Sequence, residues 1–221
     1  MTHGELSASA LGLMLLLGAY HGLNPGMGWL FAVALGMQEQ KSATLARSLV
    51  PIALGHALAV GAAVFAAVLL GVSLPLAVIR SIVAALLLGL GVFFLVKHWH
   101  PRWVRMQVGF GDLTLWSFLM ATAHGAGLMV LPVLLGAGTA QADSSGGAAS
   151  RAHAHMAAAT SPLAGLFATA VHTAGYLVVT GLIAWIVYRK VGLAVLRKAW
   201  FNVDTLWAVA LVGTGVITFL M

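Results

Sequence analysis

The sequence predicts an all-α, polytopic membrane protein with six transmembrane helices arranged as two inverted three-helix repeats. Three observations predict it: an extremely apolar composition, long continuous apolar runs, and histidine-bearing segments that recur in both halves. Of the 221 residues, 61% are hydrophobic and 7% are charged, whereas a soluble domain carries about 25% charged residues. So few polar side chains cannot cover a soluble surface, and we expect one membrane domain over residues 1–221.

The apolar runs fit six spans of about 20 residues each. Their continuous apolarity, without alternating polarity, favours helices over strands. The first run is not preceded by Lys or Arg, which is the wrong start for a cleaved signal peptide, so we expect it to remain as a helix. The spans are placed near residues 9–36, 48–71, 75–96, 113–137, 163–188 and 203–221.

Basic residues set the predicted orientation. Of the 11 Lys and Arg residues, all but Arg80 and Arg151 follow the first, third or fifth span. Cytoplasmic loops carry such an excess, so both termini, and a flexible loop near residues 138–162, are expected to be extracytoplasmic in a protein of the cytoplasmic membrane. Six tryptophans would then form an aromatic belt at the cytoplasmic helix ends: Trp99, Trp103, Trp116, Trp185, Trp200 and Trp207.

The net charge of +6 belongs mostly to this cytoplasmic rim. A basic rim attracts anionic membrane lipid. No nucleic-acid partner is therefore expected, and the sequence leaves a homo-oligomer open.

Three short segments of the first half recur in the second. YHGLNPGMGWL has its counterpart in AHGAGLMVLPV, GHALAVGAAV in VHTAGYLVVTG, and GLGVFFL in GTGVITF. The repeats would cover about 9–96 and about 113–221. Because each half has three spans, the second copy must be inverted, as in many secondary transporters with a midplane substrate site.

The repeat pairs four histidines inside the predicted spans: His21 with His124, and His56 with His172. An ionisable side chain inside the membrane is costly and usually faces the bundle interior or a water-filled cavity. Neutral imidazole is a good ligand for transition metals such as Ni, Co, Cu, Zn and Fe. We therefore predict a midplane metal site lined by these four residues.

The first predicted helix is interrupted at YHGLNPGMGWL. Asn24 is one turn from His21 and can share its helix face. Pro25 removes a helix hydrogen bond, while Gly22 and Gly26 loosen the turn. Such breaks are tolerated where they line a cavity, so the side-chain carbonyl of Asn24 is predicted to assist the site.

HGLNPGMGWLFAVALGMQEQ followed by PIALGHALAV resembles the first half of the nickel/cobalt efflux permeases, a family of the LysE-like transporter superfamily. By that resemblance, Gly22, Pro25 and Gly26 with His21 match an N-terminal histidine motif, and His56 matches a histidine of the second helix. The resemblance implies metal export. It also implies a histidine-bearing hydrophilic loop, which here would contain His153 and His155.

Two positions depart from that family. Asn24 stands where those permeases have an acid, and Met27 where they have a second histidine. The five carboxylates, Glu5, Glu39, Asp112, Asp143 and Asp204, are expected in loops or near helix ends. A dication held by neutral imidazoles keeps its full charge, so softer Cu(I), with Met27 and Met129 as added ligands, stays an alternative.

Other function classes remain open. The same four histidines are compatible with a small membrane-embedded metalloenzyme, or with a redox protein that ligates haem between His21 and His124 or between His56 and His172. Protonated histidines could also serve a permease for an anionic or organic solute. The preferred function is a permease that moves a transition-metal cation by alternating access, with no catalytic residues.

Overall fold

The computed structural model describes residues 8–96, 108–142, 162–191 and 196–220. Throughout these residues the regular structure is helical and contains no strand, which confirms the all-α expectation. The elements are α1 (Ala8–Leu23), η1 (Pro25–Met27), α2 (Trp29–Gln38), α3 (Ser42–Ser73), α4 (Leu76–Val96), α5 (Phe110–Ala123), α6 (Ala126–Ala142), α8 (Pro162–Ile186), the π-helical turn η2 (Val187–Val191) and α9 (Leu196–Leu220).

Three helical segments are long and apolar enough to cross a membrane: Ser42–Leu70, Ala77–Val96 and Leu163–Lys190. A bent pair, Phe110–Ala123 with Ala126–Leu134, makes a fourth if it is counted as one span. The first and last predicted spans contain the shorter apolar helices α1, α2 and the Trp207–Leu220 part of α9. The described residues thus hold three to four candidate spans.

The first and fourth apolar runs are broken rather than continuous. Between α1 and α2, the chain passes through η1 and then Gly28, whose φ of 132° is open to glycine but strained for other residues. Between α5 and α6, the axis bends by 56° at His124 and Gly125, where Gly125 has φ 69°. Each break follows a histidine that the sequence placed at midspan.

The helices present apolar side chains outward and polar ones inward. Leu16, Leu166 and Phe219 are 66–70% exposed, whereas His21, His56 and His172 are 0% exposed. Hydroxyl groups on the helices mostly donate to the carbonyl four residues earlier, so their donors are satisfied without water. This distribution is the one expected of helices in lipid.

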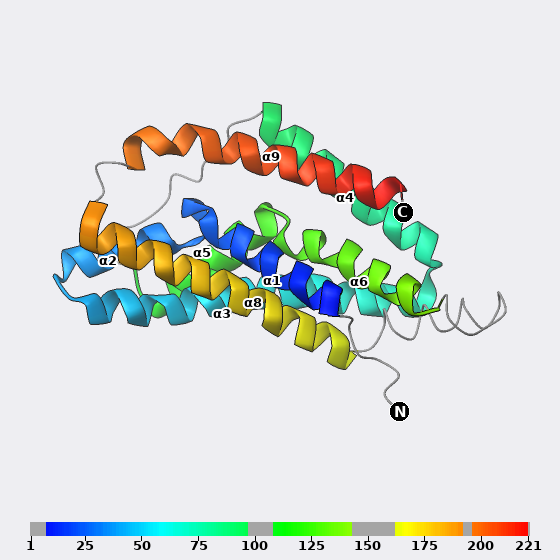
Figure 1. Ribbon diagram of the computed structural model, residues 1–221, viewed down its shortest axis with the longest axis horizontal. Helices are drawn as coiled ribbons and strands as arrows, with labels where there is room; N and C mark the ends of the chain where they lie inside the picture. The colour runs from blue at the N-terminus through cyan, green and yellow to red at the C-terminus, as the bar shows by residue number, and fades with distance from the viewer. Residues whose placement is uncertain (1–7, 97–107, 143–161, 192–195, 221) are drawn as a thin grey trace.

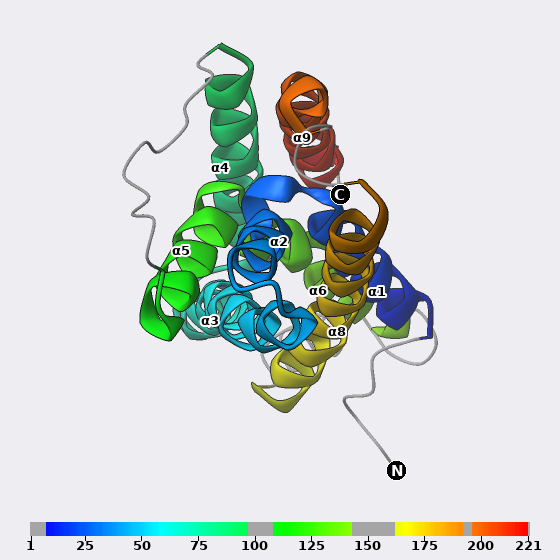
Figure 2. The same ribbon diagram turned by 90° about the vertical axis from the view of Figure 1, so that its left-hand side faces the viewer.

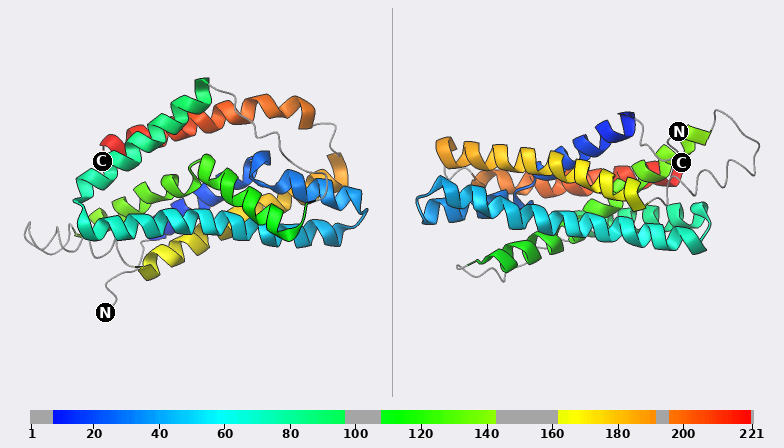
Figure 3. Two further views of the ribbon diagram at one scale, coloured as in Figure 1. Left: turned by 180° about the vertical axis from the view of Figure 1, so that it is seen from behind. Right: turned by 90° about the horizontal axis from the view of Figure 1, so that it is seen from below.

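Helices that are distant in sequence pack as three close pairs: α1 with α8, α3 with α5, and α4 with α9. Figures 1 and 2 show α4 and α9 as a separate layer along one side of the other helices. The views from behind and below (Figure 3) show the long α3 and α8 running through the main body. The candidate site lies in that body, where α1, α3 and α8 meet.

Some predictions need correction. Trp207 is not interfacial, because it is 2% exposed and packs in the core. Asp204 lies within α9 rather than near a helix end, because α9 begins at Leu196. The position of Trp116 in an aromatic belt stays a prediction; its half-buried indole donates to the Gly26 carbonyl, 3.2 Å away. The loop near 138–162 beyond Ala142, with His153 and His155, lies outside the described residues.

Candidate metal centre

Three of the four predicted histidines meet in the core. The ring centroids of His21 and His172 are 5.0 Å apart, those of His56 and His172 are 5.3 Å apart, and those of His21 and His56 are 5.7 Å apart. All three side chains are fully buried. We call this group the histidine triangle.

Small residues bring α1 and α8 close enough to form it. A Cβ on Gly18 would lie 1.9 Å from the carbonyl oxygen of His172, and a Cβ on Gly22 would lie 2.7 Å from the carbonyl oxygen of Tyr176. From the other side, a Cβ on Gly175 would lie 2.4 Å from the Leu15 carbonyl oxygen. Only glycine allows this backbone approach, so Gly22 serves close packing in addition to its place before the helix break.

Main-chain carbonyls fix the tautomers of two members. His21 Nδ1 lies 2.7 Å from the Leu17 carbonyl oxygen, and His172 Nδ1 lies 3.2 Å from the Met14 carbonyl oxygen. Because a carbonyl oxygen only accepts, each Nδ1 must carry the proton. In the neutral ring Nε2 then has a free lone pair, and neither Nε2 atom has a hydrogen-bond partner. Metal-binding histidines are held in this same way.

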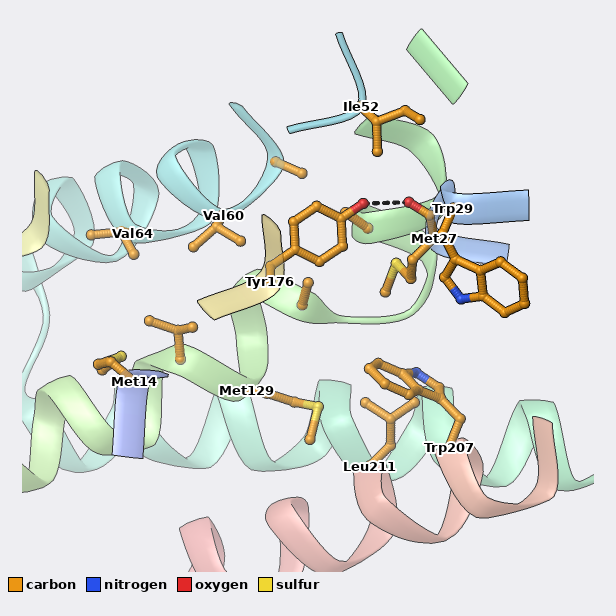
Figure 4. Close-up of a cluster of buried hydrophobic side chains, with 14 of the residues drawn as sticks. Met14, Met27, Trp29, Ile52, Val60, Val64, Met129, Tyr176, Trp207 and Leu211 are labelled. Atoms are coloured by element: carbon orange, nitrogen blue, oxygen red, sulfur yellow. Dashed lines mark hydrogen bonds between the residues drawn. The ribbon is translucent and has the colours of Figure 1, made fainter. Parts of the chain in front are cut away.

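His56 is held by stacking instead. Its ring centroid lies 3.9 Å from that of Tyr176, and the two ring planes meet at 7°. Neither nitrogen of His56 has a hydrogen-bond partner. Tyr176 itself is anchored, because its hydroxyl donates to the Met27 carbonyl (Figure 4). Rotation of His56 about its Cβ–Cγ bond therefore breaks no hydrogen bond.

His124 stands apart from the triangle. Its Nδ1 donates to the Met120 carbonyl oxygen at 2.8 Å, and its ring stacks on Phe94. Trp207 lies between the two groups, with its ring centroid 4.7 Å from that of His21 and 5.6 Å from that of His124. The indole also donates to the His124 carbonyl oxygen at 3.0 Å.

Side-chain hydrogen bonds, one accepted by Asn24 and three donated by aromatic residues, occupy backbone groups at the helix break. The side-chain oxygen of Asn24 accepts from the Gly26 amide at 2.9 Å, so Asn24 caps the Pro25–Met27 turn. Asn24 Nδ2 is buried without a partner. The main-chain carbonyls of Leu23, Gly26 and Met27 accept from Trp29, Trp116 and Tyr176, respectively.

The spacing of the triangle suits a metal ion, but its ring orientations do not yet converge. Tetrahedral coordination with metal–nitrogen bonds of about 2.1 Å puts imidazole centroids about 5 Å apart. However, the rings of His56 and His172 are nearly parallel, at 10°, so their in-plane lone pairs do not meet at one point. Among the described residues, no group of three or more His, Asp or Glu side chains is arranged to hold a metal ion.

Comparisons with protein-family models, with curated proteins and with solved structures find no match for this chain.

Two aromatic residues of the site were not predicted from the sequence. Tyr176, which supports His56, is one turn after His172 in an otherwise apolar helix, and that isolated polar ring is a signal that could have marked it. In the predicted repeat, Trp207 corresponds to Val83, so that prediction gave no reason to place Trp207 beside His21. Met27 and Met129, predicted as secondary ligands, are both buried in the same core (Figure 4).

Proposed function

We propose that this chain is a membrane permease for a transition-metal cation, which binds at the histidine triangle. The observation that carries the proposal is the pair of fixed tautomers: His21 and His172 each donate Nδ1–H to a carbonyl and keep an unpaired Nε2 in the core. Buried lone pairs without donors are costly. A bound cation would remove that cost, and its departure would restore it, as a carrier that releases its cargo requires.

The same tautomers favour a cation over an anion. An anion would face two Nε2 lone pairs, and it could be held only after both rings took up a proton. The two haem pairs are also less favoured. His56 and His172 are stacked too closely to admit a porphyrin between them, and Trp207 contacts both His21 and His124.

The proposed site needs one local change on binding. His56 must turn so that its lone pair points at the ion held by His21 and His172. The nitrogens of His56 have no hydrogen bond to break, and Tyr176 provides a flat surface beside the ring. We therefore assign His56 as the movable ligand and the other two as fixed ligands.

The proposed topology is six spans in two inverted repeats, with both termini extracytoplasmic. Two observations support the repeat. His21 and His124 each donate Nδ1–H to the carbonyl four residues earlier, just before a helix break. In the proposed repeat α1 corresponds to α5, α3 to α8 and α4 to α9. The close pair α1–α8 then corresponds to the close pair α5–α3, and the pair α4–α9 corresponds to itself. Rocking of the two units about the triangle would give alternating access.

Orientation can be tested directly, because the chain contains no cysteine. Lys41→Cys and Pro75→Cys each add one thiol at an exposed connection. In intact cells, a membrane-impermeant maleimide should label the Pro75→Cys protein and not the Lys41→Cys protein. The reverse pattern would overturn the proposed orientation. Labelling of both proteins would contradict a membrane span between residues 41 and 75.

Function is tested with a matched pair of variants. Asparagine can keep an N–H for the helix carbonyl while removing Nε2. His21→Asn should therefore abolish binding of added metal to the purified protein and metal flux into proteoliposomes, whereas His124→Asn makes the same exchange outside the triangle and should leave binding intact. Equal loss in both variants, or no binding of any tested metal by the unaltered protein, would sink the proposal.

A further inference from the structure

We infer that the cargo is a soft univalent cation of the Cu(I)/Ag(I) class. This inference rests on the proposed function, because it names the ion taken by the same histidine triangle. It is carried by the charge balance of the described residues and by the methionines that are buried in the same core.

The three imidazole ligands bring no negative charge, and the described carboxylate side chains lie away from them. Glu39 and Asp112 are both exposed at helix ends. Glu39 accepts from the Thr44 hydroxyl and Asp112 accepts from the Gly109 amide. An ion bound by His21, His56 and His172 alone would keep its full charge inside the protein.

Charge then discriminates strongly between ions. The cost of moving an ion from water into a medium of low dielectric rises with the square of its charge, so a univalent ion pays about a quarter of the cost of a dication of equal size. The described residues supply no counter-ion, so the triangle penalises Ni(II), Co(II) and Zn(II) far more than Cu(I) or Ag(I).

Three methionines are buried in the same core as the triangle. Met14 is fully buried, and its carbonyl accepts from His172. Met27 is fully buried, and its carbonyl accepts from Tyr176, whose ring stacks on His56. Figure 4 shows these two methionines and Met129 in one core. Thioether and imidazole groups together select Cu(I)-like ions over harder dications.

The probe is Ag(I), added alone in chloride-free buffer, because it does not change oxidation state during the measurement. Purified full-length protein should bind one Ag(I) that His21→Asn removes, at an affinity at least about 100-fold above that for Ni(II) or Zn(II). Met27→Leu keeps the volume but not the sulfur, and should weaken this Ag(I) site by about 10-fold. Met37→Leu, a matched change at the far end of α2, should not.

The outcomes separate the two proposals. If Ni(II) or Zn(II) binds at the His21-dependent site as tightly as Ag(I), the univalent assignment is overturned while the permease proposal stands. Dication binding that also disappears in Asp204→Asn would identify the missing counter-ion on α9. If the unaltered protein binds none of these ions in a His21-dependent way, the proposed function itself fails.

Discussion

The imidazole of His172 lies 5.0 Å from that of His21 because α8 and α1 touch backbone to backbone at Gly18. A Cβ at Gly18 would lie 1.9 Å from the His172 carbonyl oxygen. The position of one proposed ligand is therefore set by the absence of a side chain on the neighbouring helix.

Gly18→Ala should force α8 away from α1 and destabilise the protein by about 1–3 kcal/mol, as overpacking does. His172 would move with its helix, so metal affinity should also fall. Thermal unfolding in detergent and equilibrium metal binding measure the two effects. Gly12→Ala is the control on the same helix: no atom is within 4 Å of its added Cβ. A loss of equal size in both variants would contradict this account of the α1–α8 contact.

His56→Leu should separate stability from function. In the metal-free protein, both His56 nitrogens are buried without partners, and an unsatisfied buried group costs about 1–3 kcal/mol. Leucine removes that cost, so we expect the metal-free variant to be about 1 kcal/mol more stable, yet no longer stabilised by added metal. Thermal melts with and without metal provide the check. A marked destabilisation of the metal-free variant would show that His56 has a structural role instead.

Trp207→Ala should loosen the α4–α9 layer. The indole is 2% exposed, stacks on Tyr20 at 5.0 Å and donates to the His124 carbonyl oxygen. Removing a buried large aromatic side chain costs about 3–5 kcal/mol. The control is Trp185→Ala, at an exposed indole on α8, which should cost less than about 1 kcal/mol. Unfolding midpoints that fall equally in the two variants would argue against Trp207 as the link between the layers.

The α4–α9 contact gives a test of the repeat. A Cβ on Gly91 would lie 2.6 Å from Val212 Cγ2, and a Cβ on Gly215 would lie 2.9 Å from Leu88 Cγ. In the proposed repeat Gly91 corresponds to Gly215 and Leu88 to Val212, so the two contacts are equivalent. Gly91→Ala and Gly215→Ala should therefore each cost about 1–3 kcal/mol, by similar amounts.

The matched controls are their exposed neighbours Gly89 and Gly213, where no atom is within 4 Å of an added Cβ. Alanine at either should leave the protein as stable or raise its free energy of unfolding by up to about 1 kcal/mol, because alanine is the better helix former. If one member of the buried pair were tolerated and the other not, the two contacts would not be equivalent.

The sequence by itself determined the class and the composition of the core. Few charges and long apolar runs predict helices in lipid, because backbone groups in lipid must be hydrogen-bonded within their own segment. Such helices turn their few polar side chains inward. The same reasoning singled out His21, His56 and His172, because histidine is rare and costly in such runs. It also marked the interrupted helix at Pro25.

Only the tertiary structure decided which of these residues meet. The predicted repeat makes His21 and His124 equivalent, but the structure packs them against different neighbours. Trp207, whose counterpart is Val83, fills the space between the two histidines and leaves His124 outside the triangle. Hydrogen bonds to the Leu17 and Met14 carbonyls then fix where the lone pairs point. Such contacts depend on interhelical distances of a few ångströms, and linear spacing carries no information about them.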